Sequence, residues 1–155
     1  MKSIPLGSIY ACLFSRGDGT FHWAIVIPKP DGECMKYHAV SDDKPWRYVC
    51  ASDNLQKDIR VCVVVKLGSF ANRTYKEIDE FLKQIPIETP PDDLPQRFTC
   101  RIWFKEAIRV LNKRGVIRCT SVNSLETELR MYGEEHWRLT ELGSPPKLYD
   151  SDYSC

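Results

Sequence analysis

Apolar and polar positions divide the chain into a first half with strand periodicity and a second half with helix periodicity. Aromatic and β-branched residues are concentrated in four segments of the first half, which is typical of strands: residues 8–14, 21–27, 34–40 and 59–67. The last segment is almost continuously apolar, which indicates burial on both faces of a sheet. Gly- and Pro-containing turns separate the first three segments and predict two hairpins.

The second half predicts two to three helices. A capping box predicts the first helix over residues 74–85, and a loop with four prolines follows over residues 86–97. Further helices are expected over residues 99–113 and from about Ser124 to Tyr132. Strands that precede helices, instead of alternating with them, indicate an α+β fold. We expect an antiparallel sheet of about four to six strands packed against two to three helices.

Length and composition fit one domain over residues 1–142, followed by a polar, proline-containing tail over residues 143–155 that we expect to be flexible. The chain of 155 residues has 22 basic and 21 acidic residues, so nothing favours a nucleic-acid partner. No apolar run has the length of a membrane span, and the first residues lack the features of a signal peptide. We therefore expect a cytoplasmic protein without a membrane anchor. The sequence does not predict its oligomeric state.

Seven cysteines are the most informative feature of the composition. The number is odd and no two cysteines have C-x-x-C spacing, so we expect free thiols in a reducing compartment. A zinc site formed by His22, His38, Cys34 and Cys100 is conceivable, but the paired-ligand spacing of zinc sites is missing. We expect neither a metal ion nor a cofactor.

Two of the three histidines are placed symmetrically about a predicted turn. His22 and His38 lie in neighbouring strands, and their midpoint falls within the turn Lys29–Gly32. A hairpin centred there places the two side chains opposite each other on one face, with Cβ atoms about 4.5–5.5 Å apart. A shift of one residue would place them on opposite faces. The alternative interpretation is two structural histidines, one packed and one exposed.

Cys100 differs from the other six cysteines in its position. It follows Thr99, a good N-cap residue, and therefore lies in the first turn of a predicted helix. Unpaired amides and the positive end of the helix dipole favour a thiolate there, and thiol pKa values at such positions fall to roughly 3.5–7.5. A thiolate is the species that attacks an acyl group. The alternative is a cysteine that fills space on an apolar helix face.

These residues resemble a known pattern. The segment His22-Trp-Ala, a hairpin, and then Tyr37-His38-Ala39 is similar to the first motif of the lecithin:retinol acyltransferase and phospholipase A/acyltransferase group, which has a circularly permuted, NlpC-type papain-like fold. The helix that begins with Cys100 matches the position of their nucleophile, and the PPPDE isopeptidases share this His-before-Cys order. The chain is also similar to a group of fungal proteins without an established function. The resemblance implies that Cys100 is a nucleophile, His22 its general base and His38 the residue that orients His22.

The chain also departs from the acyltransferase pattern. Thr20 stands where those enzymes favour a tyrosine that stabilises the oxyanion, so Tyr10 or the amide of Cys100 is a candidate substitute. The residues on either side of Cys100 differ as well, and the chain shows no carboxy-terminal anchoring helix. These differences argue against a lipid substrate more than against thiol chemistry. Aromatic side chains that are candidates to line a substrate pocket are Trp23, Trp46 and Trp103.

Three functions are therefore open. The first is a cysteine hydrolase or acyltransferase that forms an acyl-thioester on Cys100 from an ester, thioester or amide, with a small-molecule or acyl substrate as its partner. The second is an isopeptidase that acts on ubiquitin-like conjugates. The third is a non-catalytic binding module that keeps the fold, although aromatic residues in strands and helices are more often part of a core.

Overall fold

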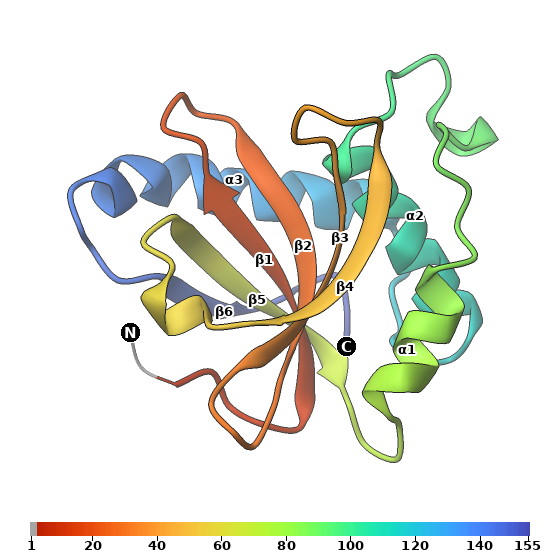
Figure 1. Ribbon diagram of the computed structural model, residues 1–155, viewed down its shortest axis with the longest axis horizontal. Helices are drawn as coiled ribbons and strands as arrows, with labels where there is room; N and C mark the ends of the chain where they lie inside the picture. Colours follow the sequence, from red (N-terminus) through yellow and green to blue (C-terminus); the bar gives the residue numbers. More distant parts are fainter. Residues whose placement is uncertain (1–2) are drawn as a thin grey trace.

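One twisted, six-stranded sheet forms the centre of the molecule (Figure 1). A computed structural model describes residues 3–155. The strands occur in the spatial order β4-β3-β2-β1-β5-β6, and their bounds are β1 Ser8–Ser15, β2 Phe21–Pro28, β3 Cys34–Val40, β4 Arg47–Asp53, β5 Val61–Ser69 and β6 Lys147–Asp150. The four predicted strands all form, and β4 is a further strand of seven residues.

Three α-helices pack against this sheet, so the predicted α+β class is confirmed. They are α1 Tyr75–Leu82, α2 Cys100–Lys113 and α3 Val122–Glu141, with short 3-10 turns η1 Leu55–Lys57 and η2 Pro91–Asp93. Helix α2 packs on β2 and β3, and α3 packs on β5 and β1. Both lie behind the sheet in the view of Figure 1. Within the part of the chain that the structure describes, no helix is long and apolar enough to cross a membrane.

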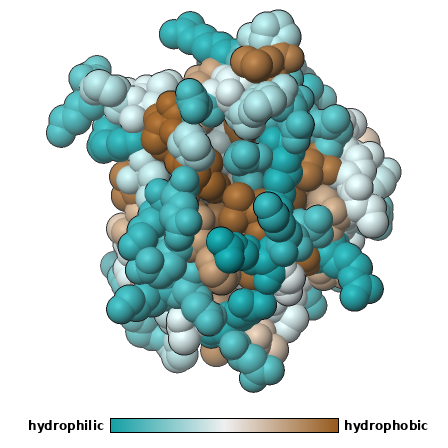
Figure 2. Space-filling model, turned by 90° about the vertical axis from the view of Figure 1, so that its right-hand side faces the viewer, coloured by the Kyte–Doolittle hydropathy of each residue, from teal (hydrophilic) through white to brown (hydrophobic). Residues whose placement is uncertain are grey.

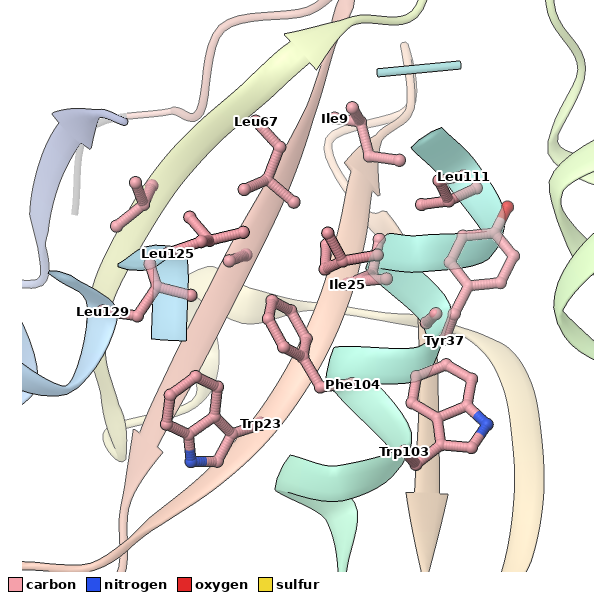
Figure 3. Close-up of a cluster of buried hydrophobic side chains, with 14 of the residues drawn as sticks. Ile9, Trp23, Ile25, Tyr37, Leu67, Trp103, Phe104, Leu111, Leu125 and Leu129 are labelled. Atoms are coloured by element: carbon pink, nitrogen blue, oxygen red, sulfur yellow. The ribbon is translucent and has the colours of Figure 1, made fainter. Parts of the chain in front are cut away.

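The core lies between the sheet and helices α2 and α3 (Figure 3). Strand β2 contributes Trp23 and Ile25, which contact residues of α2 such as Phe104. Alternate residues of the same strand, Ala24 and Val26, belong to a second, smaller cluster on the opposite face of the sheet. This alternation is the ordinary two-residue period of a strand. It decides which side of the sheet each candidate site residue faces.

The last strand corrects two expectations. Residues 147–150 form β6, which runs parallel to β5, so the sheet is mixed and not wholly antiparallel. The tail is not frayed, because the backbones of Arg118 and Cys155 exchange two hydrogen bonds and the hydroxyl of Ser154 donates to the carbonyl of Leu67. The sequence gives no sign of this because the short strand is polar and depends on partners more than 30 residues away.

Helix α3 is much longer than expected and ends at Glu141 instead of about Tyr132. Gly133 interrupts the helical pattern in the sequence. In the structure this position faces the ring of Phe21, and a Cβ added there would lie 2.8 Å from the ring's Cζ atom. The glycine therefore allows close contact between α3 and the start of β2, although a glycine in a helix interior costs about 1 kcal/mol.

The proline-rich segment 86–97 is tied to α2 by a buried ion cluster. The carboxylate of Asp93 accepts two hydrogen bonds from Arg109, at 2.8 and 2.9 Å, and lies 2.8 Å from the ammonium group of Lys105. Both Asp93 and Lys105 are buried. On the face of the molecule that carries this segment, apolar residues gather among polar side chains (Figure 2), and Ile87 and Leu94 are exposed.

Candidate functional site

The two histidines of the β2–β3 hairpin are in direct contact. Nε2 of His22 lies 2.6 Å from Nδ1 of His38, and the two rings meet edge to face. The hairpin is not centred at residue 30, because Ile25 pairs with Tyr37 and this register places His38 opposite Ala24. The expectation that His22 lies directly opposite His38 is therefore wrong. The shift amounts to two residues, which keeps both side chains on one face and lets them meet diagonally.

Both rings are held in the neutral form. Burial is the main cause, followed for His22 by the charges of His38 and Arg16, and it lowers the pKa of His22 from 6.5 to about 3. Burial also lowers the pKa of His38 to about 4, with contributions from Lys36 and Arg47. In a neutral pair one ring donates and the other accepts. The contact uses Nε2 of His22, so Nδ1 of that ring is left free.

The buried histidine pair makes a prediction about acid stability. The unfolded chain takes up a proton on each histidine below about pH 6.5, whereas the folded protein does not until far lower pH. The free energy of unfolding therefore falls as the pH is lowered from 6.5 to 5, by up to about 1.4 kcal/mol per pH unit for each histidine. Thermal unfolding measured across this range checks the slope. The double variant His22→Gln, His38→Gln should flatten it, and an unchanged slope would contradict the neutral pair.

Cys100 is the first residue of α2, as expected. The side chain of Thr99 caps this helix by accepting a hydrogen bond from the amide of Ile102. The amides of Cys100 and Arg101 have no acceptor one turn earlier, and none is found for them within residues 3–155. The N–H groups of these two residues project out of the amino-terminal end of the helix. They are candidates for stabilising an oxyanion next to the Cys100 sulfur.

The Cys100 thiol contacts Arg16 and the backbone of Phe21. Nη2 of Arg16 donates to the sulfur at 3.4 Å, and the sulfur lies 3.9 Å from the carbonyl oxygen of Phe21. That carbonyl belongs to the peptide bond between Phe21 and His22. Cys100 is only 1% exposed, so the sulfur is covered where it lies against Arg16 and the strand.

The sheet separates the thiol from the histidine pair. Phe21 and Trp23 belong to the core cluster on the helix side of β2, together with Cys100. The intervening His22 packs against the ring of Phe14, whose cluster lies on the other face. Within residues 3–155 the hydrogen bonds of the Cys100 sulfur go to Arg16 and Phe21, and none goes to a histidine. The structure thus brings the two histidines together and places Cys100 beside the His22 backbone, without a hydrogen bond between the thiol and the imidazole.

Two surface hollows meet at this point of the sheet. The first, which we call the cysteine hollow, has a volume of about 430 Å³ and is lined by residues that include Cys100, Thr20, Trp23 and Arg16. The second, which we call the histidine hollow, has a volume of about 340 Å³ and is lined by both histidines, Trp46 and, again, Arg16. Arg16 is the residue that lines both hollows.

Helix α3 fixes the turn that carries Arg16. The carboxylate of Glu141 accepts a hydrogen bond from the hydroxyl of Ser15 at 2.9 Å, and that hydroxyl accepts from the amide of Gly17. The indole of Trp137 lies beside Gly19, whose positive φ closes the turn. The end of α3, which lies beyond the helix predicted from sequence, therefore positions the β1–β2 turn next to Cys100.

The other candidate residues are only partly near these hollows. Thr20 and Trp23 line the cysteine hollow, and Trp46 lines the histidine hollow. Trp103 is fully buried and stacks on Tyr48, so it is a core residue and not a pocket wall. The hydroxyl of Tyr10 donates to the carbonyl of Pro5, and Tyr10 lies in the cluster on the far face of the sheet from Cys100. Tyr10 is therefore not available as an oxyanion donor in this structure.

Arg16 is a residue of the candidate site that the sequence does not predict. The turn Ser15–Gly19 is predicted from the sequence. The available signal for Arg16 is a cationic side chain in the turn that directly precedes the strand of His22. Its contact with Cys100 joins residues 84 positions apart, which no local pattern reveals.

In the part of the chain that the structure describes, no group of three or more His, Cys, Asp or Glu side chains is arranged to hold a metal ion.

Comparisons with known proteins give the chain a family but not a function. The pattern of the family of unknown function (DUF6540) matches residues 9–118, a segment that contains His22, His38 and Cys100. Searches of curated proteins and of solved structures found no match. Since the matched segment covers well over half of the 155 residues, the chain belongs to the family of unknown function (DUF6540).

Proposed function

We propose that this protein is a cysteine-dependent hydrolase or acyltransferase, with Cys100 as nucleophile, His22 as general base and His38 as the residue that orients His22. The observation that carries the proposal is the 2.6 Å contact between Nε2 of His22 and Nδ1 of His38. When Nε2 of His22 donates in this contact, Nδ1 of His22 is the unprotonated nitrogen and can accept a proton. The preceding carbonyl, that of Phe21, contacts the Cys100 sulfur. A nucleophile, a base and a third group that orients the base form the general arrangement of covalent acyl transfer.

The proposed reaction has two steps. The Cys100 sulfur attacks the acyl carbon while its proton passes to Nδ1 of His22, and the amides of Cys100 and Arg101 stabilise the oxyanion. The bond between the acyl carbon and the leaving group then breaks, and the leaving group takes the proton from His22. Water or another acceptor next attacks the thioester, with His22 again accepting and returning a proton. Because the sheet separates the His22 ring from the thiol, this proton transfer requires a rearrangement that brings the two side chains together and replaces the contacts of the sulfur with Arg16 and Phe21.

Acylation of the protein by an activated ester tests this proposal. With p-nitrophenyl acetate, we expect a burst of nitrophenolate and an acetyl group that peptide mass spectrometry locates on Cys100. Cys100→Ser should abolish the burst. The matched control is Cys155→Ser, which removes an exposed thiol that lines neither hollow and should leave the burst unchanged. Equal acetylation of Cys100 and the exposed Cys155, with a burst that does not depend on Cys100, would contradict the proposal.

One observation favours a second function, a non-catalytic binding module. His22 and Cys100 face different hollows, and the thiol contacts a guanidinium group instead of an imidazole. A protein of this kind would take a ligand into the hollows without forming a covalent bond to it. The same burst experiment separates the two functions, since a binding module gives no acyl-thioester.

An isopeptidase would in addition release a ubiquitin-like fusion partner, which a screen of such fusions measures.

A further inference from the structure

The two hollows carry an excess of positive charge on a chain that is almost neutral overall. The cysteine hollow is lined by Arg101, Arg130 and Glu134, and the histidine hollow by Lys36, Arg60 and Asp42, while Arg16 lines both. The chain as a whole has a net charge of only +1. Cationic side chains gathered in a concave site concentrate the positive potential there and attract anions.

Among these five cations, Arg16 is distinguished by its lack of a carboxylate partner. Arg101 and Arg130 both pair with Glu126, Lys36 pairs with Asp53, and Arg60 pairs with Asp58. Within residues 3–155 no carboxylate lies in salt-bridge distance of the Arg16 guanidinium group, whose recorded hydrogen bond goes to the Cys100 sulfur. The side chain of Arg16 is exposed, so it is free to take a new partner. A planar guanidinium group binds carboxylates with two parallel hydrogen bonds.

We propose that the substrate of the site carries a carboxylate next to its reacting carbon, and that Arg16 binds this carboxylate and thereby leaves the Cys100 sulfur. The inference rests on the proposed function, since it names the substrate class of the same thiol. It accounts for the position of Arg16 at the junction of the two hollows. It also provides a way for the almost completely covered thiol to become more accessible when an anionic compound occupies the hollow.

The charges around His22 agree with this role. After burial and His38, the cations Arg16, Lys36 and Arg60 lower the pKa of His22. A bound carboxylate would offset part of that positive charge and restore basicity to the ring. An anionic substrate would therefore uncover the nucleophile and strengthen its base in the same event.

Alkylation with a charged and a neutral reagent of similar size tests the inference. Iodoacetate and iodoacetamide both form a bond from sulfur to carbon and release iodide, but only iodoacetate carries a carboxylate next to the reacting carbon. We expect the ratio of their rate constants at Cys100 to exceed the ratio at the exposed Cys155 by up to about fivefold at low salt, which is the upper end of the effect of one exposed ion pair. High salt should reduce the difference.

Variants of Arg16 connect the preference to this residue. Arg16→Gln should bring the ratio at Cys100 down to that of Cys155, while Arg16→Lys, which keeps the charge, should retain part of the preference. The matched control is Arg73→Gln, which removes one charge from a residue outside both hollows. Equal ratios at Cys100 and Cys155, a preference that survives Arg16→Gln, or a Cys100 that neither reagent modifies would each overturn the inference.

The result is independent of acyl transfer. If Cys100 prefers the carboxylate reagent but the ester gives no burst, the anion site is supported and the proposed hydrolase or acyltransferase activity is contradicted. If the ester gives a burst but Cys100 shows no preference for the carboxylate reagent, the proposed activity is supported and the anion site is contradicted.

Discussion

Replacement of His22 by glutamine should slow the acylation of Cys100 by at least about 100-fold, the lower end of what a general base contributes. The side chain that accepts the thiol proton is lost, whereas the thiol itself, the helix start and the amides of Cys100 and Arg101 are retained. Some acylation should persist, because those groups still bind the oxyanion. Stopped-flow measurement of the nitrophenolate burst gives the rate constant directly.

The third histidine supplies the matched control for this variant. His136 lies on α3, where its ring contacts the hydroxyl of Tyr149 at 2.6 Å, and it lines neither hollow. His136→Gln should therefore leave the burst rate unchanged. His38→Gln should give an intermediate loss, since His38 orients His22 without accepting the thiol proton. Equal burst rates in wild type and His22→Gln would remove His22 as the base.

Asp93→Asn should lower the free energy of unfolding by about 3–5 kcal/mol at neutral pH, which is the usual cost of removing one partner from a buried ion pair. The side chain of Asp93 is 1% exposed, and that of Lys105 is 3% exposed. Without the carboxylate, the Lys105 ammonium group keeps one carboxylate partner among residues 3–155, Glu126 at 3.8 Å. Urea unfolding of the variant and the wild type measures the difference. The loss should also release the proline-rich segment from α2.

The neighbouring carboxylate provides a control with the same chemical change. The side chain of Asp92 is 72% exposed and lies 3.6 Å from Arg109, so Asp92→Asn should change stability by no more than about 0.5 kcal/mol. The two variants should also differ in acid. Although burial opposes it, hydrogen bonding from Arg109 and Lys105 lowers the pKa of Asp93 below 3.8. Its contribution is therefore complete above about pH 3.8 and is lost as the pH falls through the lower, folded value. A similar loss in both variants would show that burial is not the cause.

Local patterns predicted most of the fold. The strands of the first half form where β-branched and aromatic residues alternate, and Thr74 forms a capping box with Glu77 as its spacing predicts. Two elements were not predicted from the sequence because they depend on partners that are distant along the chain. Strand β6 is a short polar segment that forms only against β5. The second half of α3 continues past Gly133 because that glycine lets the helix contact Phe21.

The candidate site divides in the same way. The start of α2 at Cys100 and the contact between the two histidines follow from an N-cap residue and from a hairpin, both of which are local features. The predicted register was wrong by two residues, but the two histidines are still in contact. The period of a strand is two, so a shift of two residues keeps both side chains on the same face.

The sequence by itself therefore determined the α+β class, the helix start that carries Cys100 and the shared face of His22 and His38. Only the tertiary structure decided that the sheet separates the thiol from the histidines and that Arg16 caps the sulfur. The physical reason is that a strand pattern defines which residues share a face, but not which face a distant helix will cover. That choice depends on the burial of the whole apolar face formed by Phe21, Trp23 and Ile25, which outweighs the contacts of any single polar side chain.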